Sequence, residues 1–270
     1  MPTTMPTMPI LRGGQCARDT TMTAHTQAVE CVIQTMQSHL HEELTLDDLA
    51  SVACLSPAHF NRIFRRLIGV PPVEYLTALR FQQARQLLLM TSLRITDICY
   101  EVGYTSTGSF TSRFTQFVGL SPRQLRQRAQ AFEPGYGTLA DQRPLEIAHA
   151  PGRRHLIGRI DAPDTFQGTI YVGLFSSPIP QGRPARCARL DAPGQYLLPN
   201  VADGVYYLRA AAFPHATNPL ASLLPTEKLL LGNDPGPLLI HHGQVVGNPD
   251  LVLHSPRISD PPLVLGLPLL

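Results

Sequence analysis

Residues 46–67 read LDDLASVACLSPAHFNRIFRRL and residues 95–117 read ITDICYEVGYTSTGSFTSRFTQF, and the two stretches follow one pattern. Each begins with apolar residues at positions i, i+3, i+4 and i+7, which is the spacing of one face of a helix. These residues are Leu46, Leu49, Ala50 and Ala53 in the first copy, and Ile95, Ile98, Cys99 and Val102 in the second. The repeat therefore predicts one helical unit that is built twice.

Each copy continues with a tight turn and a second helix. In the first copy Thr45 and Ser56 occupy N-cap positions, and Pro57 takes the first position of the second helix. Gly69 and Gly119 stand where the second helices should end, because glycine accepts the left-handed conformation that closes a helix. Two helices joined by a turn of a few residues are typical of a helix-turn-helix unit.

The second helix of the first copy has the side chains that reading a DNA groove requires. Its apolar stripe would face inward and leave outside Ala58, His59, Asn61, Arg62, Arg65 and Arg66. No acidic residue occurs between Asp48 and Glu74, so this surface is locally cationic although the net charge of the chain is only +2. Asparagine suits adenine, arginine suits guanine, and alanine can touch a thymine methyl group. We expect Arg65 and Arg66 either to contact phosphates or to form a solvated face, and His59 to be a surface or packing residue.

The second copy has a milder outer face. With three phenylalanines facing inward, the outward residues are Ser106, Thr107, Gly108, Thr111, Ser112, Arg113, Thr115 and Gln116. From Val102 to Phe132 the chain has no acidic residue, and the arginines available for phosphates are Arg113, Arg123, Arg126 and Arg128. We expect this copy to contribute more to orientation than to base specificity.

The segment between the units, residues 72–90, has helical spacing and no internal helix breaker. It predicts a rigid spacer, with Tyr75 and Arg80 packing it against the two units. If the spacer presents both recognition helices to successive major-groove segments, they should lie about 34 Å apart. One monomer would then suffice to read an asymmetric site, and a dimer remains open.

Together these stretches resemble the DNA-binding domain of the AraC/XylS family over roughly residues 26–128. The resemblance implies a transcription regulator of double-stranded DNA, with RNA polymerase and a small-molecule effector as further partners. It implies base contacts by Ala58, Asn61 and Arg62 in the first unit, and in the second by Thr107, Gly108, Thr111 and Ser112. Family members often carry arginine where Ser112 stands, and here Arg113 is displaced by one position.

Near Glu133 the composition shifts to frequent proline and glycine between short apolar runs. The chain is therefore expected to be multidomain, an all-α double helix-turn-helix domain followed by an all-β sandwich. The expected boundaries are a disordered segment 1–24, the DNA-binding domain 25–131, a linker 132–144 and the sandwich 145–270.

The second half shows short strand signals separated by turn residues. The expected strands are residues 168–175, 194–201, 204–213, 236–246, 250–256 and 261–270. Residues 190–210 resemble part of the carboxypeptidase-regulatory-like, prealbumin-like sandwich. That resemblance implies that the strands beginning at Gly194 and Gly204 form a hairpin.

The sequence gives little support for catalysis, metal binding or disulfide formation. The cysteines, Cys16, Cys31, Cys54, Cys99 and Cys187, form no C-x-x-C pair, which favours reduced thiols in a cytoplasm. No secretory signal, membrane span, metal-ligand spacing or catalytic motif is present, so we expect no cofactor, no metal and no enzyme. His241 and His242 would point to opposite faces of a strand and could not share a metal.

Three functional hypotheses remain. The first is a transcription regulator whose β domain binds an effector or a partner. The second is a DNA repair protein resembling the Ada type, which needs an activated cysteine as alkyl acceptor. The third is a sugar- or protein-binding module that the helical domain tethers to DNA.

Overall fold

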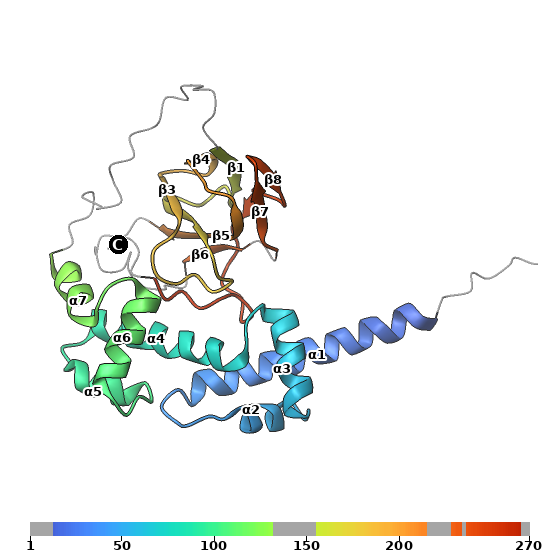
Figure 1. Ribbon diagram of the computed structural model, residues 1–270, viewed down its shortest axis with the longest axis vertical. Helices are drawn as coiled ribbons and strands as arrows, with labels where there is room; N and C mark the ends of the chain where they lie inside the picture. The colour runs from blue at the N-terminus through green and yellow to red at the C-terminus, as the bar shows by residue number, and fades with distance from the viewer. Residues whose placement is uncertain (1–12, 132–154, 215–227, 234–235, 266–270) are drawn as a thin grey trace, which may run out of the picture.

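The computed structural model of the 270-residue chain describes residues 13–131, 155–214, 228–233 and 236–265. The first half is helical and the second half consists of strands (Figure 1). The helices are α1 Gly13–Ser38, α2 Leu46–Val52, α3 Pro57–Ile68, α4 Pro72–Met90, α5 Ile95–Glu101, α6 Thr107–Val118 and α7 Pro122–Gln130. The expected linker, residues 132–144, lies outside the described residues.

The predicted repeat is confirmed in the packing. Helices α2 and α5 bury the same three positions of their apolar faces: Leu49, Ala50 and Ala53 in the first copy, and Ile98, Cys99 and Val102 in the second. Both second helices, α3 and α6, end at a glycine in the left-handed conformation, with φ of +90° at Gly69 and +85° at Gly119. The two copies therefore bury corresponding positions and end in the same way.

The N-terminal caps of these helices differ in the hydrogen bonds that their side chains make. Thr45 and Asp48 form a full capping box, in which the Asp48 backbone N–H donates to Thr45 Oγ1 at 3.2 Å and the Thr45 backbone N–H donates to Asp48 Oδ2 at 2.9 Å. Ser56 occupies the N-cap of α3 as predicted, but its side chain makes no capping hydrogen bond. Ser106 caps α6 by accepting from the Ser109 backbone N–H at 3.5 Å.

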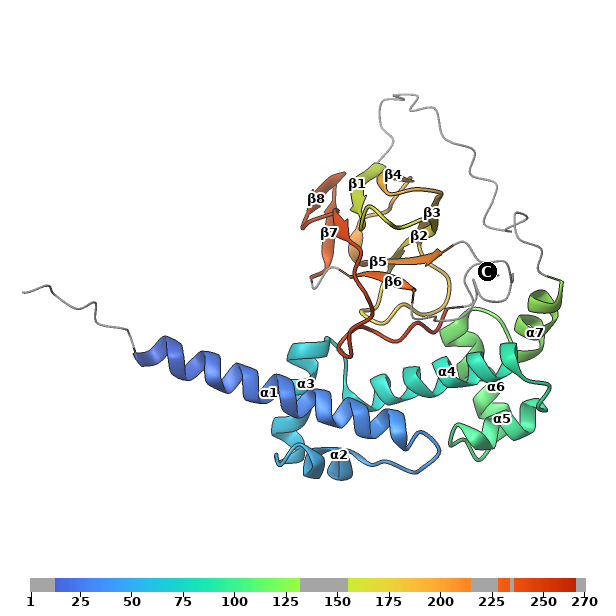
Figure 2. The same ribbon diagram turned by 180° about the vertical axis from the view of Figure 1, so that it is seen from behind.

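Helix α1 begins at Gly13, within the segment 1–24 that was expected to be disordered. No proline interrupts the chain between Gly14 and Ser38. Val32, Ile33 and Met36 anchor the helix because their side chains are fully buried in the core of the helical domain. The helix then extends past α3 (Figure 2).

The strands form two sheets. They are β1 His155–Asp161, β2 Gly168–Phe175, β3 Arg186–Leu190, β4 Gly194–Pro199, β5 Gly204–Pro214, β6 Leu230–Asn233, β7 Leu238–His241, β8 Gln244–Val246 and β9 Leu251–Val252. One sheet has the order β4-β1-β9, and the other has β3-β2-β5-β7-β8 with β6 paired to β5. Side chains of both sheets meet in one core, to which Ile160, Val172, Leu198 and Leu208 belong.

Two expectations for this half are corrected. The strands that begin at Gly194 and Gly204 do not form a hairpin, because β4 pairs with β1 while β5 pairs with β2, β6 and β7. Tyr196 and Leu208 approach the shared core from opposite sheets, so the short connection crosses between the sheets. In addition, β1, β3 and β6 lie outside the predicted strand list.

Residues 255–265, which we call the strap, run between the larger sheet and α4. A strand was expected from residue 261, yet the described part, residues 261–265, is not a strand. The strap instead bonds to α4. Tyr75 donates its hydroxyl proton towards the carbonyls of Ile258 and Asp260, at 3.2 and 3.1 Å, and the Leu263 backbone N–H donates to Gln82 Oε1 at 3.1 Å.

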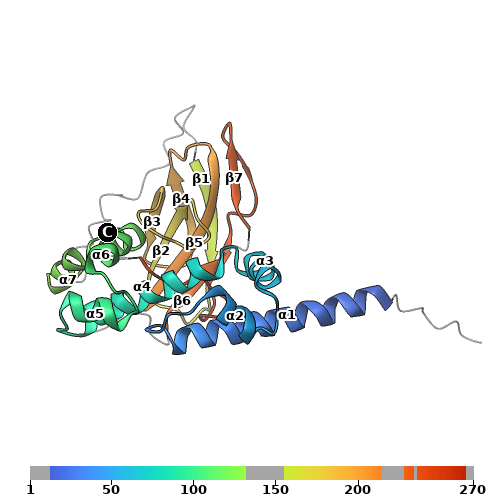
Figure 3. The same ribbon diagram turned by 60° about the horizontal axis from the view of Figure 1, so that its bottom comes forward.

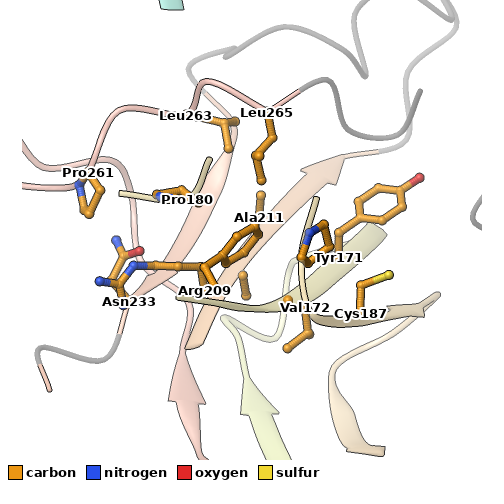
Figure 4. Close-up of a pocket in the computed structure, with 14 residues that line it drawn as sticks. Tyr171, Val172, Pro180, Cys187, Arg209, Ala211, Asn233, Pro261, Leu263 and Leu265 are labelled. Carbon is orange, nitrogen blue, oxygen red and sulfur yellow. The ribbon is translucent and has the colours of Figure 1, made fainter. Parts of the chain in front are cut away.

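The side chains of the strap alternate between the two domains. Val264 is fully buried in the helical core, whereas Leu263 and Leu265 pack on the outer face of the larger sheet. Figure 4 shows these two leucines above the sheet residues Tyr171 and Ala211. The strap therefore contributes to the helical core and to a separate apolar cluster on the outer face of the larger sheet.

Candidate nucleic-acid interface

Helix α3 presents the residues that the sequence placed on its outer face. Ala58, Arg62, Arg65 and Arg66 are exposed, and Asn61 is half-buried. Phe60, Ile63 and Phe64 are buried on the opposite side and hold the helix against the domain core. No hydrogen bond or ion pair joins Arg62 or Arg65 to another residue in the described part of the chain, so both guanidinium groups are available to a ligand.

The charged residues on the outer face of α3 are all basic. Helix α3 has no acidic residue in its first turn and two arginines, Arg65 and Arg66, in its last. Asp48, the acidic residue that precedes α3 in the sequence, is engaged in the cap of α2, where hydrogen bonds from Thr45 lower the pKa of its carboxyl group. An unneutralised cationic helix face favours a polyanionic partner.

Helix α6 brings most of its predicted residues together along an open hollow. This hollow is lined by Thr107, Gly108, Thr111, Ser112, Thr115 and Gln116. Ser106, at the N-cap, is exposed but uses its hydroxyl group to cap the helix. The face offers hydroxyl and amide groups and no charge, which agrees with a milder reading surface.

Two arginines that were expected at phosphates have partners within the protein. Arg113 is exposed and hydrogen-bonds to Tyr104, and its charge opposes the rise in the pKa of that tyrosine that burial causes. Arg126 donates from Nε to the Leu88 carbonyl at 3.3 Å and from Nη2 to the Thr91 carbonyl at 3.4 Å. Arg126 therefore joins α7 to the end of α4 and is not a free phosphate contact.

The spacer helix holds the two recognition helices. Figure 3 shows α3 and α6 near opposite ends of α4. Arg80 of α4 donates to the carbonyls of Leu40 and Glu42, at 2.9 and 2.6 Å, as expected for a packing residue. Phe81 of α4 packs on Phe117 of α6 with ring centroids 5.1 Å apart. The 34 Å separation of the recognition helices stays a prediction.

The remaining chemistry of the described residues is sparse. No three potential metal ligands lie together there, and no described helix is long and apolar enough to cross a membrane. The side chains of His241 and His242 do not point to opposite faces of a strand, as was expected. His242 lies in a turn with φ of +49°, and the two rings are 4.1 Å apart.

Two of the described cysteines have thiols that are less acidic than that of a free cysteine. Cys99 is buried and Cys187 is half-buried, and burial raises the pKa of both thiols. An alkyl acceptor of the Ada type needs the opposite shift. One relative does combine the two activities by name: "Bifunctional transcriptional activator/DNA repair enzyme AdaA" of Bacillus subtilis is 30% identical over 105 residues, which cover 39% of this chain and 50% of that protein.

Comparison with known proteins supports the reading of the helical half. The family described as "Helix-turn-helix domain" matches residues 49–128. The transcriptional regulator ArgR of Pseudomonas aeruginosa is 33% identical over 113 residues, which cover 41% of this chain and 34% of that protein. The solved DNA-binding domain of AdpA, in complex with a target DNA, is 30% identical, with a TM-score of 0.37 and coverage of 38% of this chain and 94% of that chain.

The chain spans about a third of the length of ArgR, and about a third of the length of two other transcriptional regulators that it resembles. A shorter relative is covered much further. The transcriptional activator AarP of Providencia stuartii is 32% identical over 106 residues, which cover 38% of this chain and 78% of that protein. The chain belongs to the AraC family of helix-turn-helix transcriptional regulators.

Proposed function

We propose that this protein regulates transcription by binding double-stranded DNA sequence-selectively, with α3 and α6 in successive major-groove segments. The observation that carries the proposal is the outer face of α3. Its arginines Arg62 and Arg65 have no partner among the described residues, and the helix is fixed by its buried face and by α4. One monomer holds both recognition helices, so it suffices for binding.

The roles of individual residues follow from their chemistry and exposure. On α3, Asn61 would pair with adenine, Arg62 with guanine, and Ala58 would contact a thymine methyl group. Arg65 and Arg66 lie further along the helix and would engage phosphates. On α6, a weaker reading surface would consist of Ser106, Thr107, Gly108, Thr111, Ser112 and Arg113.

For the second half we propose a β-sandwich that braces the DNA-binding domain. Its two sheets share one core, and the strap ties the outer face of the larger sheet to α4. Such a brace differs from an autonomous sugar- or protein-binding module, because Val264 completes the helical core itself. RNA polymerase would be a further partner, and the protein would act in the cytoplasm without enzymatic activity.

An effector would have to change the docking of the strap. The cavity between the strap and the larger sheet has a volume of about 30 Å³ (Figure 4). Small-molecule sites usually have about 300–1,000 Å³. A ligand could enter there only by displacing the strap, and its binding would thereby be coupled to α4.

The test is selection of bound duplexes from a random DNA pool. Wild type should enrich a motif with two informative blocks about one helical turn apart. Arg62→Ala should weaken binding by about 1–3 kcal/mol and relax the preference at one base pair. Arg159→Ala removes an exposed arginine on β1, paired with Asp161 at 2.8 Å, and should change neither. An Arg62→Ala variant that weakens equally on every sequence would remove this residue from the base contacts.

A further inference from the structure

Helix α1 passes beside the recognition helix α3. The part of α1 that does so includes residues of the segment that was expected to be disordered. Arg66 Nη2 donates to the Met22 sulfur at 3.0 Å, and the ring centroids of His25 and His59 are 5.8 Å apart. A partly open hollow of about 150 Å³ lies between the two helices. Its volume is about ten times what a single water molecule requires.

The polar lining of this hollow consists only of hydrogen-bond donors and imidazoles. His25 comes from α1, and His59, Arg62 and Arg66 come from α3, while the other lining residues are apolar. No aspartate or glutamate lines the hollow. Among the described residues, the acceptor found for Arg66 is a thioether, which is a weak one. Two guanidinium groups and two imidazoles thus converge without an anionic partner.

The missing partner has the chemistry of a phosphate oxyanion. Arginine donates to phosphate with several parallel N–H groups, and an imidazole can add a donor in either its neutral or its protonated form. Arg62 belongs both to this hollow and to the outer face of α3. A helix in a major groove is flanked by the phosphates of both strands, so the hollow would meet the backbone when α3 reads bases.

We propose that the hollow between α1 and α3 binds a backbone phosphodiester of the target DNA, and that His25 is a phosphate-contacting residue of this interface. The inference rests on the proposed function. It assigns a positioning role to α1 and to His59. By holding a phosphate, the hollow would fix α3 in the groove without reading the base sequence. His25 lies outside residues 49–128, over which the helix-turn-helix family matches.

The test measures the affinity of the full chain for its selected duplex and for an unrelated duplex, over a range of salt concentrations. His25→Ala should weaken binding to both by the same factor, roughly three- to tenfold, because phosphate contacts carry no sequence information. Arg66→Ala should make the slope of log affinity against log salt less negative by about 0.9. His25→Gln keeps a donor and should restore most of the loss.

His41→Ala is the matched control, since this imidazole follows the other end of α1 and its side chain is 64% exposed. If His25→Ala binds both duplexes as His41→Ala does, or binds more tightly, the assignment is wrong. A loss confined to the selected duplex would make His25 a base contact and also contradict it. Failure of wild type to prefer the selected duplex would instead count against the proposed function.

A second measurement separates DNA phosphate from a free anion. Thermal unfolding without DNA is compared in inorganic phosphate and in chloride at equal ionic strength, for wild type and His25→Ala. Since the hollow has the chemistry of a phosphate site, phosphate should stabilise wild type more than it stabilises His25→Ala. Stabilisation by phosphate that His25→Ala abolishes while its DNA affinity stays that of wild type would identify a site for a free anion and overturn the assignment to DNA.

Discussion

Val264→Ala tests whether the strap belongs to the core of the DNA-binding domain. The valine side chain is fully buried among helical residues. The substitution removes two methyl groups, each worth about 0.8 kcal/mol when buried, or about 1.6 kcal/mol together. The cavity left behind adds to this, so we expect a loss of about 2 kcal/mol in the free energy of unfolding. At about 2–4 °C per kcal/mol, Tm should fall by about 4–8 °C.

The assay is urea and thermal denaturation followed by the far-ultraviolet circular dichroism of the helices. The described helices all lie before residue 131, so this signal reports on the DNA-binding domain although the substitution lies in the strap. Val252→Ala on β9 is the matched control, because that side chain is 67% exposed. If the helical transition of Val264→Ala coincides with that of Val252→Ala, the two domains are independent and the brace is refuted.

Three further predictions concern the caps and the thiols. Thr45→Ala should destabilise the helical domain by about 1 kcal/mol, whereas Ser56→Ala should cost less because its side chain makes no capping bond; urea midpoints of the two variants decide this. Because hydrogen bonds lower the folded-state pKa of Asp48 below 3.8, its stabilisation should be full above that pH and disappear as the pH falls through the folded value. The stability advantage of wild type over Asp48→Asn should shrink accordingly, and a constant difference would contradict the pKa shift. In native protein a thiol reagent should modify Cys99 and Cys187 more slowly than the exposed cysteines, since burial raises the pKa of both; equal rates, measured by mass spectrometry of the labelled peptides, would argue against it.

The helical half could be predicted closely from sequence because its determinants are local. Apolar spacing defined α2 and α5, and the residues at helix ends defined the limits of α3, α4 and α6. The outer faces of α3 and α6 follow from the same periodicity, since a residue outside the buried stripe lies on the side of the helix away from the core. The partners of Arg113 and Arg126 could not be predicted, because they lie in other elements of the fold.

The β half was predicted less well because pairing depends on distant contacts. A strand was expected from residue 261, and although no strand forms there, Leu263, Val264 and Leu265 do alternate between two buried sides. These two sides contact a helix core and a sheet face, and not neighbouring strands. Strand β2 is buried on both faces for the same reason, since the strap covers its outer side. Periodicity gives the faces of an extended segment but not what covers them.

The position of the strap in the chain has a consequence for synthesis. Helix α7 ends at Gln130, and Leu265 follows 135 residues later (265 minus 130). At roughly 5–20 residues per second, about 7 to 27 s of translation separate the last helix from the strap that covers α4. During this interval Tyr75, Gln82 and Arg85 lack their strap partners. The nascent helical domain therefore remains incompletely packed until the strap, which is synthesised later, docks on α4.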